Sequence, residues 1–387
     1  MKPTTPIEHM PEGYKSFSVN CGIKDDTLDL GIIFSEKEAS AAAVFTQNKI
    51  CGAAITVGKE HIKDGKIQAV VVNSKNANVA TGERGKQDAL GICQSLSDEL
   101  GIDVSLVLPS STGVIGRPLA IEKIKAKIKG LKNNLSHPPD FISFARAIMT
   151  TDTFPKYVSK KIGDVSLAGV AKGAGMIEPD MATMLSFFFT DAKIEPGVLR
   201  EMLKKAVDAS FNSLSIDTDT STSDTVMIMA NGARGGVDEE AFQSALGDAC
   251  IELAKMIAYD AEGATKLFIV DVEGAIDDTQ AKKIGKSVIN SPLVKTAIYQ
   301  GDPNWGRIYM AIGKTSDVEI KEENIEIFWG IPPKKYENNE LALLSEYIKK
   351  NREIYLKINL NLKNGKSRVY GCDLTEEYVR INAYYTT

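Results

Sequence analysis

Two kinds of apolar pattern alternate along the chain. Short runs of consecutive or alternating apolar residues predict strands, because a strand buried on one or both faces needs apolar side chains at every second position or at every position. Longer segments in which apolar residues recur every three or four positions predict amphipathic helices. The predicted strands are residues 69–72, 104–108, 165–170, 184–190, 266–272, 318–320, 325–329, 354–362 and 367–370. The predicted helices are residues 86–100, 121–132, 141–149, 196–209, 239–259 and 281–290.

The order of these elements predicts a layered architecture in which helices pack on sheets. Helices and strands alternate without the regularity of a dinucleotide-binding fold, so the pattern fits both an α/β and an α+β arrangement. Beyond about residue 277 strands become more frequent, and we expect a smaller C-terminal lobe over residues 277–387. The sequence contains no internal repeat or low-complexity linker.

Composition and charge narrow the class of protein. Of the 387 residues, 43% are hydrophobic and 25% are charged, which is typical of a globular enzyme with a substantial core. The net charge of −5 leaves no basic excess to neutralise nucleic-acid phosphates. The basic cluster at residues 121–132 has its isoleucines and its leucine at helical spacing. Its lysines are therefore expected on a solvated helix face.

The cysteines and the N-terminal segment bear on the compartment. Five cysteines are scattered without a CxxC pair, so the sequence predicts neither a disulfide framework nor a zinc site. Residues 1–17 lack the apolar core of a signal peptide, and no apolar run is long enough to span a bilayer. We therefore expect a cytoplasmic protein.

The candidate chemistry is concentrated in residues 171–192, which read AKGAGMIEPDMATMLSFFFTDA. The chain has only three histidines, and none lies in a comparable setting, so the sequence offers little support for a Ser-His-Asp catalytic triad. A threonine made N-terminal by cleavage needs no histidine, because its own α-amine, with an unperturbed pKa of about 8, can act as the base. Thr183 follows the small residue Ala182 and suits such a cut. By residue type alone, however, Thr183 is more typical of an ordinary strand position.

Autocleavage at this junction would need a tight turn before it. Attack of the Thr183 hydroxyl on the Ala182 carbonyl would convert an amide into an ester, which water would then hydrolyse. Because intramolecular attack depends on held geometry, the preceding backbone must be well positioned. Gly173, Gly175 and Pro179 are suited to building such a turn.

The segment GVAKGAGMIEPDMATML closely resembles the self-cleaving motif of the ornithine acetyltransferase (glutamate N-acetyltransferase) family of arginine biosynthesis. The resemblance extends over nearly the whole chain through AVFTQN at 43–48, NSKNANVATG at 73–82, GDPNWGR at 301–307 and INAYYTT at 381–387. One departure is Asp180, where many family members have asparagine. This change does not touch the nucleophile but can alter the hydrogen bonding of the turn.

The resemblance implies a fold and an activity. The fold would be the layered α/β (α+β) sandwich of the self-processing aminopeptidase and ornithine acetyltransferase type. A precursor would be cut into residues 1–182 and 183–387, which would remain associated as a heterotetramer with two copies of each. The enzyme would transfer acetyl from N-acetylornithine to glutamate by a ping-pong route through an acetyl-Thr183 ester, with no metal or cofactor. Some members also accept acetyl-CoA as donor, and no residue of this chain decides that question.

The resemblance also assigns site residues. Thr112 and Gly113, in SSTGVIG, match the family's oxyanion-stabilising pair. The positions that match substrate-binding residues are Thr151, Lys172, Thr183, Glu262, Asn382 and Thr387. From the residues alone, Thr112 and Gly113 also suit a β-turn with a helix N-cap. On the same basis, Lys172 suits a solvated position and Glu262 a surface carboxylate at a helix end.

Two further acidic motifs lie near the candidate junction in the sequence. Residues 215–225, SIDTDTSTSDT, have aspartates at calcium-loop spacing, but Thr222 and Ile228 stand where an EF-hand needs glycine and glutamate. We interpret this run as structural, acting through hydroxyl and Asx hydrogen bonds. Glu178 and Asp180 flank a proline, and a polar turn fits them better than an acid–base pair.

Two other classes of protein compete with an acetyltransferase. A self-processing amidase or aminopeptidase would use the same nucleophile but pass the acyl group to water. A non-catalytic binding protein of the same fold would stay uncut. The joint presence of Thr112, Gly113, Lys172, Thr183 and Glu262 argues against the non-catalytic alternative.

Overall fold

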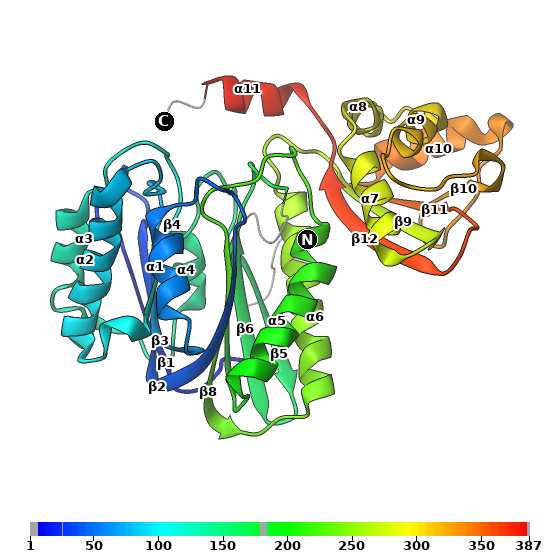
Figure 1. The fold of residues 1–387 in the computed structure, drawn as a ribbon. Coiled ribbons are helices and arrows are strands. Elements are labelled where there is room, and N and C mark those ends of the chain that lie inside the picture. The colour runs from blue at the N-terminus through cyan, green and yellow to red at the C-terminus, as the bar shows by residue number, and fades with distance from the viewer. Residues whose placement is uncertain (1–6, 25, 179–183, 385–387) are drawn as a thin grey trace.

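The computed structural model describes residues 7–24, 26–178 and 184–384, and within these residues two sheets form, each with its own helices (Figure 1). The larger sheet has the strand order β4-β3-β2-β8-β7-β6-β5, with β1 paired to β2. Its strands are β1 (Tyr14–Val19), β2 (Leu30–Phe45), β3 (Lys66–Asn73), β4 (Val107–Ser111), β5 (Lys156–Ile162), β6 (Val165–Lys172), β7 (Leu185–Ala192) and β8 (Thr225–Gly235). The helices that accompany it are α1 (Ala53–His61), α2 (Gly82–Leu100), α3 (Ile121–Ile128), α4 (Phe141–Ala147), α5 (Pro196–Ala209) and α6 (Glu239–Tyr259), with short 3₁₀ helices η1 (Val104–Leu106), η2 (Leu131–Asn134) and η3 (Phe211–Ser213).

The central strand β7 is buried on both faces. Phe188 packs in the cluster formed with α5 and α6, whereas Phe187 and Phe189 face the opposite layer. There Phe144 of α4 contacts Phe187 edge-to-face at 5.7 Å between ring centroids, and Phe141 stacks on Phe189 at 5.3 Å. A strand covered on both faces is apolar at every position rather than at every second one. This explains the uninterrupted run of phenylalanines.

The long strand β2 bends sharply near its middle. Its first part pairs with β3 and its last part with β8, and the register with β3 shifts between Phe34 and Ala39. The exposed charged residues 36–38 lie at this shift. Both ends of β2 consequently reach the upper edge of the sheet in Figure 1. This arrangement brings the loops after β3 and β4 to the same edge as the starts of β7 and β8.

The smaller sheet has the order β10-β11-β9-β12 and lies beside the first body (Figure 1). Its strands are β9 (Leu267–Ala275), β10 (Glu326–Trp329), β11 (Glu353–Asn359) and β12 (Gly365–Cys372). Its helices are α7 (Asp278–Ile289), α8 (Pro292–Gln300), α9 (Trp305–Gly313) and α10 (Leu341–Lys350), with η4 (Glu322–Asn324) and η5 (Asn338–Glu340). After β12 the chain turns back as α11 (Glu376–Tyr384), which lies over the upper edge of the first body in Figure 1.

The layered α/β fold predicted from the sequence is confirmed, and α5 and α6 have the predicted bounds. Residues 104–106 were predicted as strand but form a 3₁₀ turn, because the Asp103 carboxylate accepts from the Ser105 N–H at 2.8 Å and caps it. The strand predicted at 318–320 was wrong. These residues pair with no strand in the described part of the chain, and the partly buried side chains of Val318 and Ile320 pack against the smaller core.

The structure also bears on the predicted solvated face of the basic helix and on the predicted boundary of the C-terminal lobe. In α3, Ile124 and Ile128 are buried while Lys123 and Lys127 are exposed, so the predicted solvated face is confirmed. The smaller sheet begins with β9, ahead of the boundary expected near residue 277. Among the described residues, no helix combines the length and apolar character needed to cross a membrane.

Candidate active site

The loop after β4 approaches the loop after β3 very closely at Gly113. Thr112 is buried, and its backbone N–H donates to the Asn73 carbonyl at 3.0 Å. Gly113 has a φ of +128°, and a Cβ there would lie 2.3 Å from the carbonyl carbon of Lys75 and 2.5 Å from the backbone nitrogen of Asn76. Only glycine fits this contact. The backbone is therefore held in one conformation, as an oxyanion-binding pair requires.

Lys172 and two glycines form the turn that follows β6. Lys172 is half-buried, ends β6 and pairs with the first residue of β7. The Gly173 N–H donates to Asp152 Oδ1 at 2.7 Å. At Gly175 a Cβ would lie 2.6 Å from a carboxylate oxygen of Glu262. The missing side chain thus lets the Glu262 carboxylate rest directly on this turn.

Glu262 joins the turn to the C-terminal helix. Its backbone N–H donates to the Ala174 carbonyl at 2.9 Å, and its Oε2 accepts from Asn382 Nδ2 at 2.9 Å. Asn382 lies on α11, so the return of the chain over the first body brings this side chain to Glu262. Two predicted substrate-binding residues are therefore in direct contact.

Thr151 lies in the loop between α4 and β5, where it is half-buried. Asp152 holds this loop, because its Oδ2 accepts from the Thr150 N–H at 3.1 Å. The other oxygen of Asp152 accepts from Gly173, as described above. The loop that carries Thr151 is therefore hydrogen-bonded to the turn that carries Lys172.

The hydroxyl- and aspartate-rich run at residues 215–225 supports the segment that precedes the predicted cut. The Asp217 carboxylate accepts from the two backbone N–H groups of residues 176–177, each at 2.7 Å. The Thr220 hydroxyl donates to the Glu178 carbonyl at 3.1 Å. The predicted structural role of this run is confirmed by these bonds.

The same run is linked to the loops that hold Thr112 and Gly113. The Gly52 N–H donates to the Thr222 carbonyl at 2.9 Å, and the next N–H, of Ala53, donates to the Asn78 carbonyl at 3.1 Å. The Ala77 N–H in turn donates to the Val114 carbonyl at 2.9 Å. A continuous set of backbone bonds therefore connects the loop of Thr112 and Gly113 to the start of β8.

The predicted nucleophile and four other discussed positions lie outside the described residues: Pro179, Asp180, Ala182, Thr183 and Thr387. Directly after Thr183 along the chain, the Met184 carbonyl accepts from the Thr225 N–H at 3.0 Å. The segment after the predicted cut thus enters the middle of the sheet at once. The roles assigned to these five positions stay predictions.

Burial and neighbouring charges shift three ionisable groups at this edge. Burial lowers the pKa of Lys172, against the opposing influence of Asp152, Asp224 and Glu262. Burial alone would raise the pKa of Asp152, but Lys156 and Lys172, with a backbone hydrogen bond, hold it at about 2. Burial raises the pKa of Asp224 well above its usual value. One oxygen of that carboxyl, Oδ2, has no hydrogen-bond partner among the described residues.

Sequence reasoning missed Lys156 and Asp260, both buried beside these residues. Lys156 Nζ donates to Asp152 and to Asp260, each at 2.6 Å. No local pattern distinguishes Lys156 from a surface lysine, and Asp260 is 104 positions away along the chain. Only the tertiary structure brings the two together.

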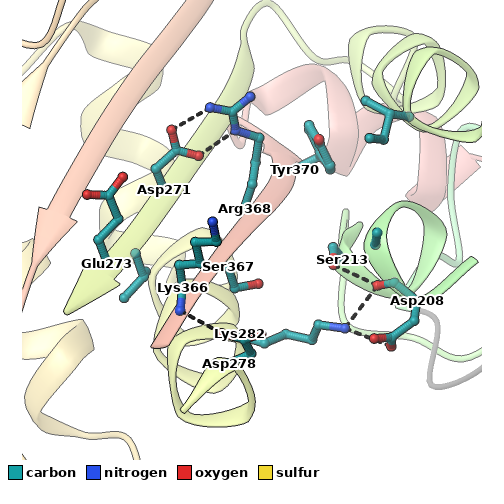
Figure 2. Close-up of a pocket in the computed structure, with 13 residues that line it drawn as sticks. Asp208, Ser213, Asp271, Glu273, Asp278, Lys282, Lys366, Ser367, Arg368 and Tyr370 are labelled. Carbon is teal, nitrogen blue, oxygen red and sulfur yellow. Dashed lines mark hydrogen bonds and ion pairs between the residues drawn. The ribbon is translucent and has the colours of Figure 1, made fainter. Parts of the chain in front are cut away.

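A cavity of about 450 Å³ is lined by residues of both bodies (Figure 2). Within it Arg368 makes two hydrogen bonds to Asp271, at 2.5 and 2.6 Å, and Lys282 Nζ reaches Asp208 at 2.8 Å. None of the described site residues lines this cavity. Because these charged groups are paired with one another, we assign no chemistry to it.

The described residues form a layered α/β fold whose upper sheet edge gathers the segments of Thr112, Thr151, Lys172 and Glu262. Comparison with known proteins makes the assignment specific. The chain belongs to the ArgJ family, whose family model matches residues 15–387. The resemblance noted in the sequence is confirmed.

Three similar proteins illustrate the relationship. Arginine biosynthesis bifunctional protein ArgJ 2 of Clostridium acetobutylicum is 50% identical over 382 residues, covering 97% of this chain and 98% of that protein. Glutamate N-acetyltransferase Oat2 of Streptomyces clavuligerus is 44% identical over 387 residues, with 97% and 98% covered. A crystal structure of arginine biosynthesis bifunctional protein ArgJ from Bacillus halodurans is 42% identical with a TM-score of 0.50, and the match covers 52% of this chain and 100% of that one.

Proposed function

We propose that this chain is a self-cleaving glutamate N-acetyltransferase that moves acetyl from N-acetylornithine to glutamate. The observation that carries the proposal is the match over 97% of the chain to glutamate N-acetyltransferase Oat2. The geometry supports it, because hydrogen bonds link the loops of Thr112, Thr151, Lys172 and Glu262 near the start of β7. These residue types supply an oxyanion site and charges for both ends of an amino-acid substrate.

In the proposed reaction the α-amine of Thr183 accepts the proton of the Thr183 hydroxyl as its oxygen attacks the acetyl carbon of N-acetylornithine. The Thr112 hydroxyl and the Gly113 N–H donate to the resulting oxyanion. The carbon–nitrogen bond then breaks, the proton passes to the ornithine nitrogen, and ornithine leaves an acetyl ester on Thr183. The amine of glutamate attacks this ester, which gives N-acetylglutamate and restores the hydroxyl.

Substrate orientation is assigned to the charged residues of the site. Lys172 would bind the α-carboxylate that both substrates share. Glu262, fixed by Asn382, would bind the side-chain ammonium of N-acetylornithine. Thr151 and Thr387 would add hydrogen bonds. No metal or cofactor enters these steps.

The proposed cut between Ala182 and Thr183 leaves two fragments that share one sheet. Strands β7 and β8, from residues 183–387, lie between β2 and β6, from residues 1–182. Strand pairing on both sides would keep the fragments together. The solved Bacillus halodurans chain is covered over its whole length but matches only 52% of this chain. A match of this extent is what one fragment of a cut protein would give. We further propose that two copies of each fragment assemble, which native mass measurement tests.

The proposal also includes acetyl-CoA as a second acetyl donor and a cytoplasmic location. Acetyl-CoA is expected to serve as a donor if the chain is bifunctional, and N-acetylglutamate formation from acetyl-CoA and glutamate tests this directly. All five cysteines are free thiols, which supports a reducing, cytoplasmic setting for the reaction.

Acetyl transfer and hydrolysis give different products from one assay. With purified protein, N-acetylornithine and glutamate, we expect ornithine and N-acetylglutamate to appear in equal amounts, since the ester passes its acetyl group to an amine. Mass spectrometry of the products provides the measurement. If acetate forms in place of N-acetylglutamate, with ornithine released at the same rate with and without glutamate, the protein is a hydrolase.

The charge of Lys172 is expected to control the Michaelis constants. Because burial lowers the pKa of Lys172, its charge is lost at a lower pH than that of an ordinary lysine. The KM for N-acetylornithine, which has no free α-amine, should therefore rise on the alkaline side. Lys172→Arg should move this rise to the higher pH at which the side-chain ammonium of the substrate loses its charge, and Lys172→Met should raise KM by about 10- to 100-fold at neutral pH through loss of a charge-assisted bond. An unchanged KM in Lys172→Met would contradict the assignment.

A further inference from the structure

Three buried charged groups lie beside the proposed site, and none of them takes part in the reaction proposed above. Lys156, the first residue of β5, donates from Nζ to Asp152 Oδ1 and to Asp260 Oδ2, each at 2.6 Å. The side chains of Lys156, Asp152 and Asp260 are 0%, 0% and 3% exposed. Burying charges is costly unless they are paired, so this cluster calls for an explanation.

The two carboxylates connect the cluster to every substrate-binding segment of the described chain apart from α11. Asp152 accepts from the N–H groups of Thr150 and Gly173, which flank Thr151 and Lys172. Asp260 accepts from the Thr153 N–H at 3.0 Å and lies two residues before Glu262. Lys156 therefore joins the loop after α4, the turn after β6 and the segment after α6.

The ammonium of Lys172 is the group most affected by this arrangement. It makes no hydrogen bond or ion pair with any residue in the described part of the chain, although charged groups surround it. These groups are Asp152 before β5, Lys156 on β5, Asp224 before β8 and Glu262 after α6. Asp152, the strongest of the attractive groups, is the competitor that a substrate carboxylate must overcome.

We infer that Lys156 is a positioning residue for substrate binding: by engaging Asp152 and Asp260 it fixes the three segments and leaves the Lys172 ammonium free for a substrate carboxylate. This inference rests on the proposed function for the identity of the substrate. Without Lys156, Asp152 would turn to Lys172 as its nearest remaining cation. A carboxylate substrate would then have to displace an internal ion pair.

The inference predicts opposite changes in the titration of Lys172. Burial is the largest influence that lowers the pKa of Lys172; Asp152 raises it, and Lys156 lowers it further. Removing the charge of Lys156 should therefore raise the pKa of Lys172. Removing the charge of Asp152 should lower it. If the two substitutions merely loosened the fold, they would not shift the pKa of Lys172 in opposite directions.

The experiment compares Lys156→Met and Asp152→Asn with the matched control Lys160→Met. Lys160 lies on the same strand and pairs with Glu252 of α6, but at the partly exposed surface, so it controls for loss of an ion pair. The pH dependence of acetylation of Lys172 by trace acetic anhydride, read by peptide mass spectrometry, reports its pKa without requiring activity. We expect a higher midpoint in Lys156→Met, a lower midpoint in Asp152→Asn and no change in Lys160→Met.

Kinetics complete the test on the processed enzyme. Lys156→Met should raise the KM for glutamate by about tenfold with kcat within a few-fold of wild type, and Lys156→Arg should restore it. If Lys156→Met fails to fold, Asp152→Asn and Lys156→Arg still decide the question through the labelling midpoint. Midpoints that stay fixed or move together in an active enzyme would overturn the inference. A wild-type protein without acetyl transfer would instead overturn the proposed function.

Discussion

Replacing Thr183 by alanine is expected to leave a single uncut chain of 42.0 kDa that transfers no acetyl group. The variant removes the hydroxyl proposed to attack in both reactions, so cleavage and transfer should be lost together. We expect transfer to fall by about 10⁴-fold or more, as for removal of the nucleophile in other acyl-transfer enzymes. Denaturing mass spectrometry measures the cut, and N-acetylglutamate formation measures the transfer.

Serine at the same position separates the hydroxyl from the rest of the side chain. Thr183→Ser keeps a hydroxyl after Ala182 and should retain part of both cleavage and transfer. A Thr183→Ala protein that is still cut, or that still transfers acetyl at the wild-type rate, would refute the nucleophile. Loss of cleavage with normal transfer would show that the two reactions use different groups.

The second large effect is expected from Gly113→Ala. A Cβ at this position would lie 2.3 Å from the Lys75 carbonyl carbon, and the φ of +128° is unfavourable for alanine. The loop must shift, which moves the Gly113 N–H and the adjacent Thr112 hydroxyl away from the proposed position of the oxyanion. Losing one such donor typically costs about 10²–10³-fold in kcat, and we expect at least that loss here.

A matched control lies three residues further along the same loop. Gly116 also has a positive φ, of +80°, but a Cβ there would meet nothing within 4 Å. Gly116→Ala should therefore cost only about 1 kcal/mol of stability through its backbone conformation and leave kcat near wild type. Steady-state kinetics and thermal unfolding of both variants provide the measurement. Equal activity in the two variants would argue that the close contact at Gly113 has no part in catalysis.

The helices and strands that were predicted well are those whose apolar residues follow a clear pattern, either helical spacing or an unbroken apolar run. Helix α6 begins after Asp238, whose carboxylate accepts from the Ala241 N–H at 2.7 Å, and its apolar residues recur with helical spacing. Strand β7 was recognisable because burial on both faces makes it apolar throughout. Strand β2 escaped prediction because its exposed charged bend interrupts the apolar pattern.

Some residues of the candidate site could likewise be predicted from the sequence, and others could not. Thr112, Lys172 and Glu262 were assigned through family resemblance, and the structure ties the turn of Lys172 to Glu262 by direct bonds. Lys156 and Asp260 could not have been found, because a buried ion pair between distant segments leaves no local signature. The short apolar alternation at 318–320 misled for a related reason, since a strand also needs a neighbouring strand with which to pair.

The most direct test of the account is the intact mass of the purified wild-type protein under denaturing conditions, with N-terminal sequencing of each species. Cleavage before Thr183 predicts two fragments whose masses add to the 42.0 kDa chain plus one water, one of them beginning at Thr183. That result would establish the freed threonine on which the proposed acetyl transfer depends. A single 42.0 kDa chain in an active preparation would contradict the N-terminal-threonine mechanism.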